Sequence, residues 1–200
     1  MADHYYAKSP KVASEPKYWD AELKGNAFRF KTDQGVFSKK EVDFGSRFLI
    51  EKFEIANVEG PVLDVGCGYG PIGLSLAKVY SDRSFHLVDV NERAIALAKE
   101  NAMLNQVENI DVYESDRFNG IGLKNFAAIL TNPPIRAGKQ VVHDILERSY
   151  HHLVPGGELW VVIQKKQGAP SAQVKLEEVF DNVEVVAKRK GYYIIKASKY

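Results

Sequence analysis

The sequence has few of the residues and runs that mark several large classes of protein. Its 200 residues include one cysteine, Cys67, which excludes an internal disulfide and a cysteine-based zinc site. No run approaches the roughly 20 apolar residues that cross a bilayer, and the amino-terminal residues lack the apolar core of a signal peptide. The formal net charge is only +1, so no global excess of charge indicates nucleic-acid binding. We therefore expect a cytoplasmic protein that is attached to no membrane.

Histidine is also scarce, with five residues in the chain. His143, His151 and His152 fall within one expected helix, but no acid or cysteine stands at ligand spacing from them. No metal site is predicted.

The pattern of apolar residues from Pro61 onward favours an α/β fold. Short apolar runs alternate with amphipathic segments, of which the stripe of Ile95, Ala98 and Ala102 is the clearest. Such alternation is typical of a mostly parallel sheet with helices on both faces. The last two runs flank Gly191 closely, which predicts an antiparallel hairpin at the carboxyl end. Seven strands are predicted, at residues 62–65, 85–90, 110–113, 126–131, 159–164, 183–188 and 192–196.

The first 53 residues follow a different pattern. Residues 1–18 are polar and aromatic, and are expected to form an arm. Apolar runs at 19–23 and 28–31 flank the turn dipeptide Gly25-Asn26, which predicts a small hairpin. A helix is expected over 40–53. We therefore expect one globular unit, in which an arm, hairpin and helix at 1–53 pack on a cofactor-binding domain at 54–200.

A glycine-rich run, Asp64-Val65-Gly66-Cys67-Gly68-Tyr69-Gly70, follows the first strand of the predicted sheet. Glycines between a strand and a helix let a ligand approach the backbone, because no Cβ stands in the way. The segment 68–73 also matches the dinucleotide fingerprint G-x-G-x-x-G, and Asp89 stands where a ribose-binding acid belongs. The pattern by itself therefore leaves an NAD-dependent oxidoreductase open.

Three carboxylates favour a different cofactor. Asp64 precedes the first glycine by two positions, Asp89 ends the second strand, and Asp116 follows the third. Parallel strands end at one edge of a sheet, where ligands bind, so these acids should gather around one loop. Carboxylates would repel a diphosphate but suit a sulfonium-bearing amino-acid nucleoside.

The segment Asn132-Pro133-Pro134 follows the fourth strand of the predicted sheet and indicates a methyl acceptor site. An exocyclic amine on a purine is a poor nucleophile, because its lone pair is delocalised into the ring. The Asn132 side-chain oxygen and the Pro133 carbonyl could accept its two N–H groups and favour a pyramidal nitrogen. Consecutive prolines fix φ and add no competing N–H, so these acceptors are held rigidly. Catalysis would then rest on positioning and fixed electrostatics.

On these motifs the chain resembles the class I S-adenosylmethionine-dependent methyltransferases. More narrowly, it resembles the ribosomal RNA small-subunit guanine-N2 methyltransferase family and its short single-domain bacterial relatives. The similarity runs through nearly the whole chain and is most specific at residues 35–38, 43–46, 64–70 and 131–139. It implies a Rossmann-like fold and S-adenosylmethionine as the cofactor.

The resemblance also implies roles for individual residues. Position 135 is Ile, where many amino methyltransferases of this class carry Tyr or Phe to stack on the target base. Either another residue stacks on the base, with Phe37 a candidate, or apolar contact replaces the stacking. The implied catalytic residues are Asn132, Pro133 and Pro134. The implied cofactor contacts are Asp64, Gly66, Gly68 and Gly70 at the methionine end, Asp89 and Asn91 at the ribose, Asp116 at the adenine, Phe37 and Ser38 across the pocket, and Asn132.

Basic residues follow three of the proposed site loops. If they meet at one rim, they would form a phosphate-binding patch for an RNA whose target base is unpaired or flipped out. The basic residues are Lys39 and Lys40, Arg136 and Lys139, and Lys165 and Lys166. Substrate contacts are expected at Ile135, Arg136, Lys139, Lys165 and Lys166.

Taken together, the sequence predicts an S-adenosylmethionine-dependent N-methyltransferase. The expected acceptor is the exocyclic N2 amine of a guanine in small-subunit ribosomal RNA, free or in the small ribosomal subunit. Adenine N6 or a protein glutamine remain alternative acceptors in the same reaction class. An NAD-dependent oxidoreductase and a catalytically silent RNA-binding module are alternatives from other classes.

Overall fold

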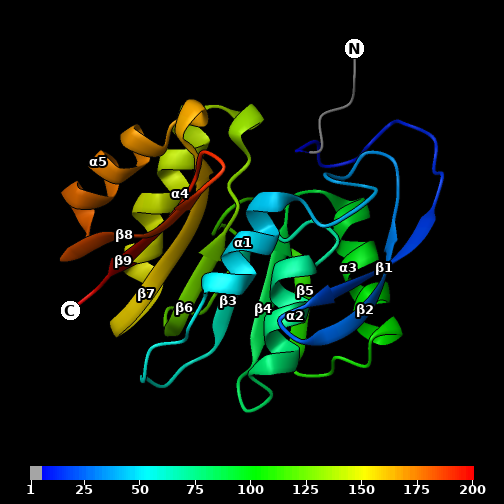
Figure 1. Ribbon diagram of the computed structural model, residues 1–200, viewed down its shortest axis with the longest axis horizontal. Coiled ribbons are helices and arrows are strands. Elements are labelled where there is room, and N and C mark those ends of the chain that lie inside the picture. The colour runs from blue at the N-terminus through cyan, green and yellow to red at the C-terminus, as the bar shows by residue number, and fades with distance from the viewer. Residues whose placement is uncertain (1–5) are drawn as a thin grey trace.

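A computed structural model describes residues 6–200 of the chain. Its main feature is a seven-stranded sheet of order β5-β4-β3-β6-β7-β9-β8 (Figure 1). Strands β3 to β7 are parallel, whereas β9 runs antiparallel to both β7 and β8. The strands are β3 (Val62–Val65), β4 (Phe85–Asp89), β5 (Ile110–Glu114), β6 (Phe126–Thr131), β7 (Leu153–Gln164), β8 (Asn182–Arg189) and β9 (Tyr192–Ser198).

Helices cover both faces of the sheet because the central strands carry apolar side chains on both sides. Along β3, Val62 belongs to one buried apolar cluster, and Leu63 and Val65 belong to the other. The first cluster includes side chains of α1, α2 and α3, and the second includes side chains of α4 and α5. Figure 1 shows where these helices lie along the sheet. The helices are α1 (Phe44–Lys52), α2 (Pro71–Val79), α3 (Glu92–Leu104), α4 (Lys139–His152) and α5 (Ala169–Val179), with the 3-10 turns η1 (Ile135–Ala137) and η2 (Lys165–Gln167).

The amino-terminal hairpin pairs β1 (Lys17–Leu23) with β2 (Asn26–Thr32). Its turn consists of Lys24 and Gly25, both with positive φ, so Asn26 begins β2 rather than forming part of the turn as predicted. Asn101 of α3 and Asn105, the C-cap of the same helix, then bind the edge of β2. Asn101 accepts from the Lys31 N–H and donates to its carbonyl, and Asn105 does the same at the Arg29 backbone.

Helix α1 begins four residues later than the sequence pattern predicts. Asp43 is its N-cap and accepts a hydrogen bond from the Ser46 N–H through its side chain. This bond satisfies one of the N–H groups that the first turn of a helix leaves unpaired. The helix therefore starts at Phe44, and the preceding residues approach it as an irregular segment.

The predicted fold class is confirmed, with a mostly parallel seven-stranded sheet, an antiparallel carboxyl-terminal hairpin and a small amino-terminal hairpin. Strand β7 is longer than predicted, because it begins directly after α4 at Leu153 rather than at Leu159. Among residues 6–200, no helix has both the length and the apolar character needed to cross a lipid bilayer.

Candidate active site

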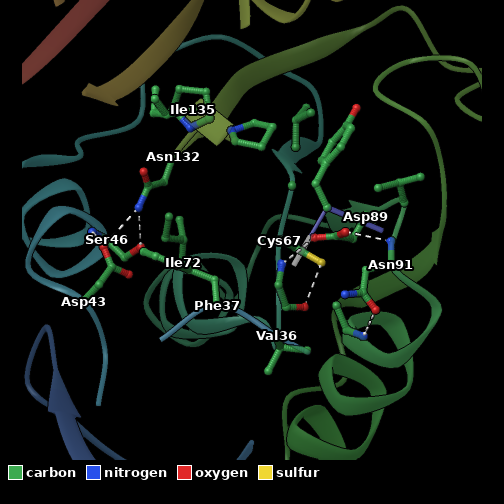
Figure 2. Close-up of a pocket in the computed structure, with 18 of the residues that line it drawn as sticks. Val36, Phe37, Asp43, Ser46, Cys67, Ile72, Asp89, Asn91, Asn132 and Ile135 are labelled. Atoms are coloured by element: carbon green, nitrogen blue, oxygen red, sulfur yellow. Dashed lines mark hydrogen bonds between the residues drawn. The ribbon is translucent and has the colours of Figure 1, made fainter. Parts of the chain in front are cut away.

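A cavity of about 270 Å³ opens at the carboxyl ends of the parallel strands. The strand order reverses between β3 and β6, which is the point where wound α/β sheets bind ligands. The loops after β3, β4, β5 and β6 all contribute to its wall, together with residues of the amino-terminal segment and Tyr192 of β9 (Figure 2). The lining includes Val36, Phe37, Asp43, Ser46, Gly66, Cys67, Gly68, Asp89, Asn91, Arg117, Asn132, Pro133, Pro134, Ile135, Arg136 and Gln167.

The glycine loop turns sharply between β3 and α2, with Gly66, Gly68 and Gly70 at φ of 74°, 59° and 99°. These positive angles are accessible to glycine at little cost. A Cβ at Gly66 or Gly68 would meet no atom within 4 Å, so the loop presents bare backbone at the cavity wall. Gly70 does not line the cavity, and a Cβ there would lie 2.8 Å from Leu74.

Asp64 lies beneath the glycine loop and does not line the cavity. Its side chain is fully buried, and its Oδ2 accepts a 3.0 Å hydrogen bond from the Gly73 N–H of α2. Its Oδ1 has no hydrogen-bond partner. Burial raises the pKa of Asp64 to about 7, although the bond from Gly73 lowers it and the charge of Asp89 adds to the rise.

Asp89 and Asn91 stand together at the end of β4 and both line the cavity. The two oxygens of Asp89 accept from the backbone N–H groups of Gly68 and Asn91. Burial raises the pKa of Asp89, against the effect of these hydrogen bonds. Asn91 caps α3 through its Oδ1, and its Nδ2 donates to the Gly35 carbonyl. Its side chain therefore holds the amino-terminal segment beside the end of β4.

Asp116 follows β5 but does not line the cavity, whereas its neighbours Ser115 and Arg117 do. Its carboxylate accepts hydrogen bonds from Arg117 and from the Tyr6 hydroxyl. The Arg117 guanidinium holds the pKa of Asp116 below its usual value. A contact between Asp116 and an adenine amine stays a prediction, because these partners occupy the carboxylate in this structure.

The side-chain amide of Asn132 is fixed in one orientation. Its Nδ2 donates to Asp43 Oδ2 at 3.1 Å and to Ser46 Oγ at 3.0 Å. Within residues 6–200, its Oδ1 accepts no hydrogen bond, and Figure 2 shows this oxygen pointing away from Asp43 and Ser46. Pro133 and Pro134 are buried behind it in the cavity wall. The side-chain oxygen of Asn132, which the sequence predicts to accept a hydrogen bond from the target amine, is thus held in one orientation by Asp43 and Ser46.

Sequence reasoning missed these two neighbours, together with Tyr6 and Tyr192 of the lining. The resemblance includes the segment 43–46 but implies no role for its residues. Its signal is the N-cap spacing of an acid three residues before a small polar residue. That spacing predicts the start of a helix, but it does not reveal a contact with a residue 89 positions away.

The remaining predicted residues are only partly brought together. Phe37 lines the cavity with 46% of its surface exposed, while Ser38 lies outside the lining and donates to the Glu41 carbonyl. Ile135 and Arg136 line the cavity, whereas the exposed side chains of Lys139, Lys165 and Lys166 do not. In the part of the chain that the structure describes, no cluster of three or more potential metal ligands occurs.

The sheet order, the bare glycine loop and the acids at its edge define an S-adenosylmethionine-dependent methyltransferase of class I fold. The family model of the methyltransferase small domain matches residues 27–196, and the chain belongs to this family. The predicted cofactor, S-adenosylmethionine, is thereby confirmed. It fits the residues present, since the backbone at Gly66 and Gly68 is open at the cavity wall and the Asp89 carboxylate lines the same cavity.

Three similar proteins give the context. The uncharacterized protein YbxB of Bacillus subtilis (strain 168) is 60% identical over the whole of both chains. The ribosomal RNA small subunit methyltransferase C of Vibrio cholerae is 31% identical over 92% of this chain and 53% of its own length. A 16S rRNA N2 methyltransferase of T. thermophilus, solved with AdoMet and guanosine, has a TM-score of 0.83 at 25% identity, covering 96% of this chain and 52% of its own. The chain therefore spans about half the length of these two rRNA methyltransferases.

Proposed function

We propose that this protein methylates the exocyclic N2 amine of a guanine in small-subunit ribosomal RNA. The observation that carries the proposal is the fixed Asn132 amide, whose oxygen is left without a partner among residues 6–200 at the cavity wall. The V. cholerae relative named for small-subunit ribosomal RNA supports the substrate. The T. thermophilus structure, named for N2 of a 16S rRNA guanine, supports the target atom.

The cofactor is assigned to the part of the cavity formed by the loops after β3, β4 and β5. Backbone at Gly66 and Gly68 is open to a ligand, and the Asp89 carboxylate at the end of β4 suits a pair of ribose hydroxyls. When bound, S-adenosylmethionine supplies an electrophilic methyl group. The other proposed cofactor contacts that line the cavity are Phe37, Asn91 and Asn132. The remaining residues of the predicted set lie outside the lining and would act on the cofactor only through the loops that carry them: Ser38, Asp64, Gly70 and Asp116.

The acceptor amine is assigned to the loop after β6. The Asn132 Oδ1 and the Pro133 carbonyl would each accept one N–H of the amine, which favours a pyramidal nitrogen whose lone pair is less delocalised into the ring. Asp43 and Ser46 hold Asn132 in the required orientation, so little reorganisation is needed when the base enters. The buried prolines keep the second acceptor in place. These residues therefore orient the amine and contribute no strong base.

RNA is assigned to the surface beside the acceptor loop. Ile135 and Arg136 line the cavity, and Gln167 brings the end of η2 to the same wall. Lys165 and Lys166 precede Gln167 on η2, and Lys139 begins α4 directly after η1, so cations lie close along the chain to both lining segments. Phosphate contacts there would draw a single-stranded or flipped-out guanine toward Asn132.

Transfer of labelled methyl groups tests the proposal. The purified protein is incubated with labelled S-adenosylmethionine and with RNA or ribosomal subunits from cells that lack it, and the nucleosides are then analysed. Labelled N2-methylguanosine in small-subunit RNA is the expected result. Label in N6-methyladenosine or in protein glutamine would replace guanine with one of the alternative acceptors. No label in any RNA, with cofactor binding intact, would refute an RNA substrate.

An Asn132→Ala variant separates chemistry from binding in the same assay. We expect turnover to fall below detection, because the amine loses its side-chain acceptor, while S-adenosylmethionine still binds in calorimetry. The matched control is Asn119→Ala, which removes an exposed amide that bonds to Arg148 away from the cavity lining. Full activity of Asn132→Ala would contradict the proposed mechanism.

A further inference from the structure

Asp43 has one carboxylate oxygen in use and one without a partner. Its Oδ2 accepts hydrogen bonds from the Ser46 N–H at 3.0 Å and from Asn132 Nδ2 at 3.1 Å. Its Oδ1 accepts no hydrogen bond within residues 6–200, and Asp43 takes part in none of the ion pairs of that region. The side chain is half-buried and lines the cavity beside Asn132 (Figure 2). An unpaired anionic acceptor therefore stands next to the residue assigned to the target amine.

The side chains that pack beside Asp43 include two aromatic rings, and no ion pair within residues 6–200 involves its carboxylate. Tyr192 packs against Gly45 beside it, since a Cβ at Gly45 would lie 3.0 Å from Tyr192 Cε1 and 3.3 Å from Asp43 Oδ2. Phe44 lies against Tyr192, with ring centroids 5.2 Å apart. A carboxylate with apolar rings on one side and an open cavity on the other is suited to a ligand donor, because a partly buried charge gains most from a hydrogen bond.

The chemistry of the possible acceptors differs at the atom next to the amine. In guanine, the ring atom N1 beside the N2 amine carries a hydrogen and is a donor. In adenine, the ring atom N1 beside the N6 amine carries a lone pair and is an acceptor. In a glutamine side chain, the neighbouring atom is a carbonyl oxygen, which is also an acceptor. A carboxylate at this position therefore favours guanine and opposes the other two.

We propose that Asp43 selects guanine, with its Oδ1 accepting the N1–H while Asn132 Oδ1 accepts one N–H of the adjacent N2 amine. This inference rests on the proposed function, since it assumes that the base amine binds at Asn132. It assigns Asp43 two separate tasks: Oδ2 orients Asn132 and caps α1, and Oδ1 reads the base. A site built to bind a donor rejects an analogue that lacks it, because a buried polar group is then left unpaired.

An RNA oligonucleotide with 2-aminopurine at the target position tests whether Asp43 recognises the hydrogen on N1. The oligonucleotide spans the guanosine that the methyl-transfer experiment identifies. 2-Aminopurine keeps the N2 amine but has a lone pair at N1 in place of the hydrogen. We expect kcat/KM of the wild type to be about 100-fold lower for 2-aminopurine than for guanosine, the size of one good base contact.

The Asp43→Asn variant changes only the group that would contact N1 of the base. Asparagine also caps helices well, and its oxygen can replace Oδ2 toward Ser46 and Asn132. Its amide nitrogen then replaces Oδ1 and presents a donor, which opposes the N1–H of guanine and suits the lone pair of 2-aminopurine. We expect kcat/KM to fall for guanosine and to rise for 2-aminopurine, which reverses the preference. Retained binding of S-adenosylmethionine in calorimetry shows that the variant is folded.

Ser46→Ala is the matched control, because it removes one of the two acceptors that orient Asn132 and leaves Asp43 in place. Its kcat/KM should fall for both bases by the same factor. Equal use of guanosine and 2-aminopurine by the wild type would overturn the inference while the proposed function stands. An equal loss on both bases in Asp43→Asn would reduce Asp43 to an orienting role and also overturn it. The proposed function itself is overturned at the earlier step, if the methyl-transfer experiment labels no guanosine in small-subunit RNA.

Discussion

The buried carboxylate of Asp64 leads to a quantitative prediction about stability. One oxygen accepts from the Gly73 N–H, the other accepts nothing, and burial raises the pKa from 3.8 to about 7. Folding therefore opposes ionisation of this group, because its ionised form is poorly compensated in the folded protein. One pKa unit is equivalent to about 1.4 kcal/mol, so the full difference corresponds to roughly 4 kcal/mol.

The sign of the effect follows from the two protonation states. Below about pH 4, Asp64 is protonated in the folded and unfolded protein, and its contribution to stability is fully present. As the pH rises toward 7, the unfolded chain loses the proton while the folded protein keeps it, so the free energy of unfolding falls. Above about pH 7 both states are ionised and the contribution has been lost.

An Asp64→Asn variant removes this titration, because asparagine has no proton to lose. Urea unfolding of the cofactor-free proteins at pH 5, 6, 7 and 8 measures the difference. Relative to the wild type, we expect the free energy of unfolding of the variant to rise by about 1.4 kcal/mol per pH unit up to pH 7 and then to level off. Asp82→Asn is the control, since its carboxylate is 82% exposed. Parallel curves for Asp64→Asn and wild type across this range would refute the reasoning.

Other substitutions test the cavity wall. Asn132→Asp places a second carboxylate about 3.1 Å from Asp43. The value of kcat should therefore fall about 100-fold at pH 8 and recover at lower pH, where the two carboxylates share a proton. A pH-independent rate would contradict this expectation. Gly68→Ala should weaken cofactor binding about tenfold in calorimetry, because its Cβ enters open space at the cavity wall. Gly73→Ala should instead lower the free energy of unfolding by about 1–3 kcal/mol in urea, since its Cβ would lie 2.6 Å from a β4 side chain. Equal effects of the two glycine variants on binding would count against the assignment. Tyr6→Phe removes the hydroxyl that donates a hydrogen bond to Asp116, which follows β5. The Kd of the cofactor should rise about threefold with kcat unchanged. An unchanged Kd would show that this hydrogen bond is dispensable.

The parallel strands and the glycine loop could be predicted because each leaves a local signal. Strand β6 is buried on every residue, and its first five residues form an uninterrupted apolar run. The loop after β3 needs positive φ at closely spaced positions, which the sequence meets with glycines. The position of Asp64 could also have been derived. Residues two apart in a strand share a face, so Asp64 points with Val62 toward α2 rather than into the cavity.

The contacts that complete the acceptor side left no such local signal. Asn132 and Asp43 meet only because the start of α1 lies beside the end of β6, and 89 positions separate them. The same holds for the arm, where Tyr6 reaches Asp116 across 110 positions. Neither periodicity nor turn chemistry reports on pairs of this kind, since both are properties of neighbouring residues.

The acceptor side of the site depends on how firmly α1 is held. At its carboxyl end, Lys24 of the hairpin turn donates from Nζ to the Ile50 carbonyl at 3.1 Å, which binds a carbonyl of the last turn. At its amino end, Phe44 packs against Tyr192 of β9. A helix fixed at both ends cannot rotate without breaking one of these contacts, so the Asp43 carboxylate stays at the end of β6. The parallel sheet therefore provides the cofactor edge, whereas the choice of methyl acceptor depends on a segment that precedes the sheet in the chain.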